Sequence, residues 1–169
     1  MAGATLSARF DDGQVRRAFV VLAAMGRDRG VLAAMGVGLA RNTRRRFDAA
    51  QDPDGRAWAP LNPAYAAVKK GSGILRDSAM RGGLQGSITS AVEGRSVVVG
   101  SNKIYAAVHQ FGATITAKKS PTLAFRLGTA LVRPRSVTIP ARPYLGFSTR
   151  DEETVREVAF DALRRAMGG

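Results

Sequence analysis

The residue types from which enzymes assemble catalytic groups are scarce in this chain. Its 169 residues include no cysteine and a single histidine, His109. A thiolate nucleophile, a disulfide and a cysteine-based zinc or iron–sulfur site are therefore excluded, and one histidine cannot build a multi-histidine metal cage. As a general base His109 would need an acidic partner, but the nearest acids before and after it in the sequence are Glu93 and Asp151. We interpret His109 as a structural residue.

Two carboxylates and two glycine-rich stretches are the remaining candidates for chemistry. Asp52 and Asp54 are close enough in sequence to share a divalent cation, but a calcium loop would continue with further oxygen ligands and a glutamate that are missing here. Aspartate next to a Pro-Asp-Gly sequence is typical of a turn. The stretches 71–73 and 81–83 lack the lysine and the strand-to-helix context of a phosphate-binding loop. We therefore expect no catalytic activity, no metal ion and no cofactor.

Basic residues dominate the chain and gather in its middle. Lysine and arginine total 26 against 13 aspartate and glutamate, a net charge of +13, and residues 55–150 hold fourteen of the basic residues but only two acids. Such a segment is expected to face a polyanion or an acidic protein surface. The acid-free stretch 118–150 supplies the candidates for an interface with another subunit, a partner protein or DNA: Lys118, Lys119, Arg126, Arg133, Arg135 and Arg142.

Two interpretations of this basic stretch stay open. Charged residues commonly form a solvated surface that needs no partner. Alternatively, the stretch lies against the phosphates of a nucleic acid. No recognition helix and no set of stacking aromatic residues is evident in the sequence, so binding of that kind would be non-specific.

Hydrophobic periodicity changes twice along the chain, and this predicts an α+β fold. Helical spacing indicates N-terminal helices within residues 12–47, and alternating apolar residues over 84–140 indicate a largely antiparallel sheet with a basic β-hairpin. A last amphipathic helix covers about 150–167 and begins with an acidic turn. We expect one domain over 1–169, in which helices from both ends pack on one face of the sheet and the basic hairpin projects away.

Short-range signals locate several turns. Gly94 lies between two alternating stretches and can adopt the left-handed conformation of a tight hairpin loop. Trp58, the only tryptophan, follows a Pro-Asp-Gly turn, a position from which a tryptophan usually pins a loop to the core. Gly36 and Gly38 interrupt the second helix, so each marks either a kink or a point of close packing.

Targeting segments are not apparent in the sequence. The first twelve residues contain two aspartates where a secretory signal needs an apolar core. The longest apolar run, 19–25, is much shorter than the ~20 residues that span a bilayer. We expect a soluble protein, made and used in a cytoplasm, that has no membrane partner.

Five short motifs follow one another along the chain in a fixed order. They are DGRAWAPL at 54–61, GILRDS at 73–78, VVVGSNKIYA at 97–106, HQFG at 109–112 and IPARPYLG at 139–146. In this order they resemble the motifs of the phage virion morphogenesis family, which includes tail-completion proteins of Mu-like and P2-like tailed phages. The resemblance extends over about residues 30–165. One segment, 77–84, is longer than the compact leucine-containing turn that the family leads us to expect.

The resemblance implies a structural virion protein rather than an enzyme. It implies a ring, expected to be hexameric, at the head–tail junction as a neck, tail-completion or tail-terminator component. Its partners would be copies of itself, neighbouring neck and tail tube proteins, and phage DNA in the channel, with assembly in the host cytoplasm. A non-specific nucleic-acid-binding protein is the alternative. The resemblance also implies four aromatic fold anchors: Trp58, Tyr105, Phe111 and Tyr144.

In such a ring the cations of the basic hairpin are multiplied by the copy number. They repel one another unless acidic residues of a neighbouring subunit, an acidic partner or DNA phosphates neutralise them. The acidic first turn of the last helix, residues 151–153, is one candidate for that neutralising surface.

Overall fold

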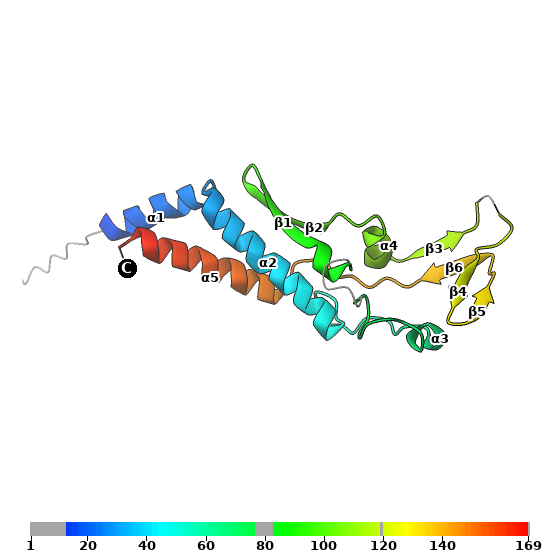
Figure 1. The fold of residues 1–169 in the computed structure, drawn as a ribbon. Helices are drawn as coiled ribbons and strands as arrows, with labels where there is room; N and C mark the ends of the chain where they lie inside the picture. Colours follow the sequence, from blue (N-terminus) through cyan, green and yellow to red (C-terminus); the bar gives the residue numbers. More distant parts are fainter. Residues whose placement is uncertain (1–12, 77–82, 119, 169) are drawn as a thin grey trace, which may run out of the picture.

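Helices occupy both ends of the chain and short strands its middle (Figure 1). The structure, a computed structural model, describes residues 13–76, 83–118 and 120–168. Within these ranges no helix combines the length and apolarity that crossing a membrane requires. The predicted α+β class is confirmed by the elements, which in chain order are α1 (Gly13–Met25), α2 (Arg29–Ala49), α3 (Pro63–Ala66), η1 (Gln85–Ser87), β1 (Ile88–Glu93), β2 (Ser96–Ser101), α4 (Ala106–Phe111), β3 (Ala113–Thr116), β4 (Phe125–Leu127), β5 (Ala130–Val132), β6 (Ser136–Ile139) and α5 (Thr149–Ala166).

The two longest helices begin at local capping signals. The Asp28 carboxylate accepts hydrogen bonds from two N–H groups in the first turn of α2, at 2.7 and 3.2 Å. Ser148 begins α5 in a capping box: its hydroxyl accepts from the Asp151 N–H, and the Asp151 carboxylate accepts from the Ser148 N–H. The helices expected within 12–47 and over 150–167 are therefore present.

Antiparallel pairing is also present, but the single sheet expected over 84–140 is wrong. In the described part of the chain the strands form three separate two-stranded sheets. β1 and β2 make the hairpin that turns at Gly94, whereas β3 pairs with β6 and encloses the β4–β5 hairpin. Residues 102–112, which contain α4, separate β2 from β3. The chain turns at Gly112, where a Cβ would lie 2.8 Å from the backbone nitrogen of Ala141.

α2 lies between the β1–β2 hairpin and α5, and two glycines permit this close packing (Figure 1). A Cβ on Gly36 would come 3.0 Å from Ser90 on β1, and a Cβ on Gly38 would come 2.4 Å from Thr154 Cγ2 on α5. The two glycines therefore mark opposite packing faces of α2 rather than a kink.

A small aromatic core lies at the C-terminal end of α2. The Phe47 ring is fully buried and meets the Trp58 ring edge-on, with centroids 5.4 Å apart, and the Tyr144 ring at 5.1 Å. Leu84 and Ile88 complete this core with Ala40. It joins four segments that are distant in the sequence, so it holds together the middle of the molecule.

The molecule is elongated, with its core between two extended ends (Figure 1). α1 and the C-terminal part of α5 lie at one end. The other end is formed by β3 to β6, residues 113–139, which we call the basic arm. The hairpin expected to project from the domain lies in this arm, away from the aromatic core.

Candidate assembly interface

Four of the predicted interface cations are exposed on the basic arm. Arg126 is on β4, Arg133 and Arg135 lie between β5 and β6, and Lys118 follows β3. None of the ion pairs between described residues involves these four side chains. Lys119 lies outside the described residues. The structure therefore places unpaired positive charge at one end of the molecule.

Arg142 does not belong to that surface. Its side chain is 5% exposed, and it donates hydrogen bonds from Nε to the Ala59 carbonyl (2.8 Å) and from Nη2 to the Pro60 carbonyl (2.9 Å). Burial lowers the pKa of this guanidinium from its ordinary value. The expectation that Arg142 faces a partner is corrected, because two carbonyls of the loop after Trp58 draw it into the interior.

Two of the four aromatic residues implied as anchors lie in the core. The Trp58 indole donates from Nε1 to the Pro143 carbonyl at 2.8 Å, and the Tyr144 hydroxyl donates to the Ala106 carbonyl at 3.1 Å. Burial raises the pKa of that phenol. Both side chains are almost fully buried, at 6% and 1% exposure. They anchor the loop after α2 and the segment before α5.

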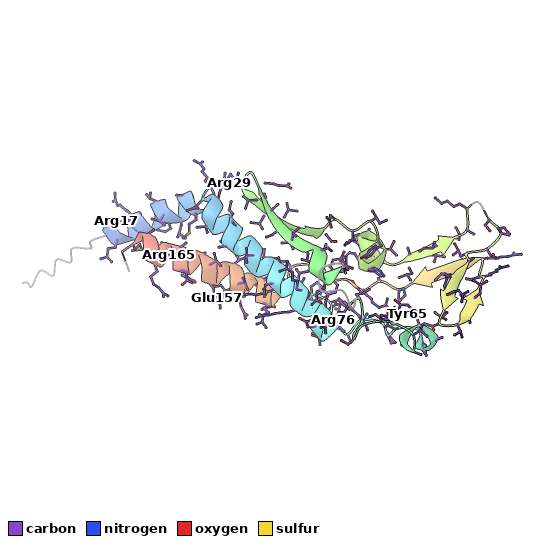
Figure 2. The ribbon with its side chains drawn as sticks, viewed as in Figure 1. Arg17, Arg29, Tyr65, Arg76, Glu157 and Arg165 are labelled. Atoms are coloured by element: carbon purple, nitrogen blue, oxygen red, sulfur yellow. The ribbon has the colours of Figure 1, made fainter. Side chains whose placement is uncertain are left out.

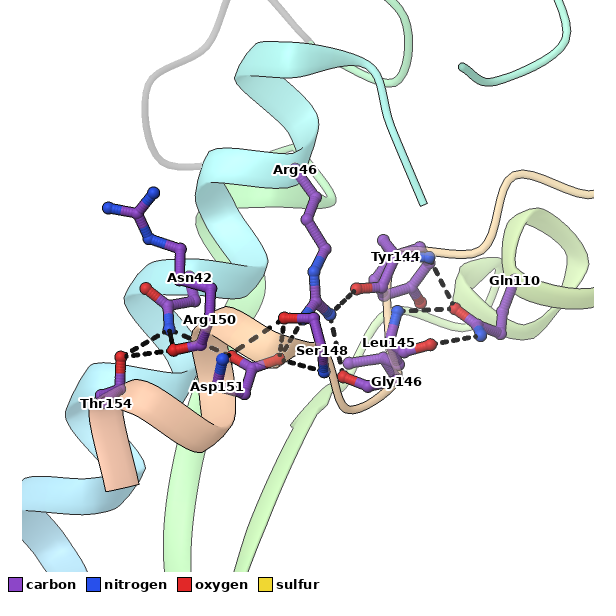
Figure 3. A network of polar contacts seen from close by, with 10 residues as sticks. All are labelled: Asn42, Arg46, Gln110, Tyr144, Leu145, Gly146, Ser148, Arg150, Asp151 and Thr154. Carbon is purple, nitrogen blue, oxygen red and sulfur yellow. Dashed lines mark hydrogen bonds and ion pairs between the residues drawn. The ribbon is translucent and has the colours of Figure 1, made fainter. Parts of the chain in front are cut away.

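Tyr105 and Phe111 lie elsewhere: they are 40% and 77% exposed. The short helix α4 is held to the core through Gln110, whose side chain accepts from the Tyr144 and Leu145 N–H groups and donates to the Leu145 carbonyl (Figure 3). Phe111 is the next residue along the helix, and most of its surface is in solvent. The expectation that these two side chains are core anchors is corrected.

A buried ion pair joins α2 to α5 (Figure 3). Arg46 Nη2 pairs with the Asp151 carboxylate, and the side chains are only 8% and 2% exposed. Arg46 Nη1 also donates to the Tyr144 and Gly146 carbonyls, at 2.8 and 3.0 Å, while Asp151 accepts from the Asn42 amide at 3.1 Å. This network fixes the start of α5 against the end of α2.

The Arg46–Asp151 pair corrects the expectation for Asp151. Arg46 is one of four arginines near the end of α2, and nothing in its local sequence distinguishes it from the others. Asp151 was one candidate for neutralising cations of a neighbouring subunit, but its charge is used within its own chain. The capping-box spacing from Ser148 indicates that Asp151 turns back toward the helix start. No such local signal identifies Arg46, which lies 105 positions earlier, as the partner of Asp151.

The outer face of α5 carries the acids that remain accessible. Glu153, Glu157 and Asp161 follow one another at four-residue spacing and are exposed, so they form an acidic stripe along one side of the helix, with the exposed Arg150 and Arg164 at its two ends. Figure 2 shows Glu157 on the side of α5 away from α2. Phe160 lies beside the stripe and is 58% exposed. These carboxylates take part in no ion pair between described residues.

A cleft of about 1180 Å³ separates the basic arm from α3 and the segment after it. Its apolar side chains include Tyr65, Val68 and Phe125, which stay 39–45% exposed. Its cations include Lys70, Arg126 and Arg133, and none of the described lining residues is acidic. This charge pattern suits an acidic ligand that also carries an apolar group.

His109 also lines this cleft, but its surroundings do not resemble a catalytic site. Its Nδ1 is buried and has no hydrogen-bond partner among the described residues. Desolvation, together with the positive charge of Arg142, lowers the pKa of the imidazole from its ordinary value of 6.5. Its ring meets Tyr105 edge-on at 5.9 Å. Among the described residues, no cluster of three or more histidine or acidic side chains is arranged to hold a metal ion.

Comparison with known proteins agrees with the order of motifs. Residues 10–164 match the phage virion morphogenesis family. The chain is 32% identical over 157 residues to "Putative capsid assembly protein G" of Escherichia phage Mu. This alignment covers 89% of this chain and 88% of that protein. It is 38% identical over 74 residues to Mu-like prophage FluMu G protein 2 of Haemophilus influenzae, or 44% of this chain and 42% of that protein.

No solved structure matches the chain. The family match nevertheless includes α2, the core residues Trp58 and Tyr144, the basic arm and nearly all of α5. The alignment with the phage Mu protein runs along almost the whole of both chains. This protein belongs to the phage virion morphogenesis family.

Proposed function

We propose that this protein is a structural virion component of a tailed phage, and that identical copies form a ring at the head–tail junction through which the genome passes. Family membership supports a role in virion assembly. A neck, tail-completion or tail-terminator component of this kind needs no turnover. It needs a subunit shape that leaves enough surface for neighbouring copies.

The large solvent-accessible area of the chain is the observation that supports the ring. The chain exposes 12247 Å², whereas a compact monomer of 17.9 kDa exposes about 8000 Å². Leaving out the twenty residues outside the described ranges lowers the area of the chain by about 3000 Å² and that of the compact monomer by about 700 Å², so an excess of about 2000 Å² remains. Two standard interfaces remove about 1600 Å² from one subunit of a ring. The exposed area thus matches a protein that has neighbours on two sides.

The exposed cations of the basic arm favour one alternative function. Lys118, Arg126, Arg133 and Arg135 have no acidic partner among the described residues, so the arm could also bind DNA phosphates without sequence preference. In that function the monomer itself binds DNA, and affinity falls steeply as salt rises. In a ring, the same charges face the channel or the next subunit.

Size-exclusion chromatography with light scattering separates these functions. The protein is run alone and together with the neck and tail tube proteins of its own phage. We expect a mass that is a fixed multiple of 17.9 kDa, a hexamer being the expected size, either alone or on a partner ring. A protein that stays monomeric in both runs and binds DNA tightly as a monomer would contradict the proposal and support the alternative.

A further inference from the structure

The cleft beside the basic arm has the composition of a protein docking site. Tyr65, Val68 and Phe125 keep about two fifths of their surface in solvent, although all three line the cleft. Interfaces between proteins typically surround such an apolar centre with a charged rim. Here the rim contains Lys70, Arg126 and Arg133, which are all exposed. The ligand that fits is an acidic surface with a protruding apolar side chain.

The acidic stripe of α5 presents that pattern. Glu153, Glu157 and Asp161 line one side of the helix, and the exposed Phe160 lies beside them, one turn after Glu157. The hydrophobic residues that hold α5 in its own chain lie on the other side of the helix, against α2. The stripe therefore remains available without any change in the fold.

The two surfaces cannot meet within one chain. α5 runs from the core toward the end of the molecule opposite the basic arm (Figures 1 and 2). A contact between them must join two copies, and it uses a different surface on each copy. Such a head-to-tail contact produces a closed ring when the rotation from one copy to the next brings the last copy back to the first. Otherwise it produces a filament.

We propose that the acidic stripe of α5 docks into the cleft beside the basic arm of the next copy, with Phe160 inserted against Tyr65, Val68 and Phe125. This contact deepens the proposed function and rests on it, because it is the contact that repeats around the ring. It neutralises the cations of Lys70, Arg126 and Arg133, which would otherwise repel one another in a ring. It also covers Phe160, which is 58% exposed in the isolated chain.

Charge exchange between the two surfaces tests the contact. The first variant carries Lys70→Glu, Arg126→Glu and Arg133→Glu. The second carries Glu153→Lys, Glu157→Lys and Asp161→Lys, and a third chain carries all six changes. Each three-residue variant places like charges opposite each other. We expect it to self-associate at least about tenfold more weakly than the wild type in sedimentation velocity. The six-residue chain, and an equal mixture of the first two variants, should recover association because opposite charges again face each other.

Two further measurements make the result specific. The control variant carries Glu93→Lys and Arg95→Glu in the exposed β1–β2 turn, and it should associate like the wild type. Phe160→Ala should weaken association without changing any charge. Circular dichroism checks that each variant is folded.

Three results separate this contact from the ring itself. Loss in both three-residue variants with recovery in the six-residue chain supports the contact. If both three-residue variants still form the same ring as the wild type, the proposed contact is wrong and the proposed ring stands. A wild-type protein that never self-associates, alone or with its phage partners, would overturn both.

Discussion

Removing the Asp151 carboxylate should destabilise the protein more than any other single change in α5. In Asp151→Ala the Arg46 guanidinium stays buried, at 8% exposure, without its counter-charge. The Ser148 hydroxyl and the Asn42 amide also lose an acceptor. Breaking a buried ion pair on one side costs about 3–5 kcal/mol. Since domains are stable by about 5–15 kcal/mol, this loss is a large part of the whole.

Urea denaturation followed by tryptophan fluorescence measures this loss. Trp58 is the only tryptophan and contacts Phe47 in the core, so its emission reports the transition. The matched control is Glu152→Ala, which changes the exposed neighbour of Asp151 and should alter the free energy of unfolding by less than about 0.5 kcal/mol. If Asp151→Ala costs no more than Glu152→Ala, the reasoning from the buried pair is refuted.

Three other changes test separate parts of the structure. Gly38→Ala should cost about 1–3 kcal/mol of stability, because the new Cβ would come 2.4 Å from Thr154 Cγ2. Adding Thr154→Ser in the same chain should restore most of the lost stability. If Thr154→Ser does not restore it, the packing contact between the two positions is contradicted. Trp58→Phe should cost about 1–3 kcal/mol, since the half-buried Pro143 carbonyl loses its indole donor, and an unchanged denaturation midpoint would contradict this. The pKa of His109 is lowered in the folded state, so the unfolded chain takes up a proton at this residue first as the pH falls below 6.5. Below that pH, the stability of the wild type should therefore fall relative to that of His109→Gln. Parallel stability profiles of the two proteins against pH would contradict the lowered pKa.

Features that depend on neighbouring residues could be predicted from the sequence. Asp28 and Ser148 mark helix starts because a cap acts within one turn. The β1–β2 hairpin was predictable because Gly94, with φ of 60°, adopts the conformation that its turn requires. The burial of Trp58 also followed from its place after a turn.

Features that depend on distant residues could not be predicted. Arg142 becomes an internal residue because its guanidinium reaches carbonyls more than eighty positions earlier, at Ala59 and Pro60. Arg46 and Asp151 pair across 105 positions, and four arginines near the end of α2 look equivalent in the sequence. Periodicity likewise indicates strands but carries no information on which strands align, so one sheet was expected where the described chain has three.

Electron cryomicroscopy of purified virions of the phage that encodes this protein tests the proposed function most directly. We predict a closed ring at the head–tail junction, in which each copy shows the elongated fold with its arm directed toward the next copy. A virion that lacks this protein, or that carries it in the capsid shell or along the tail tube, would contradict the proposed place in the particle.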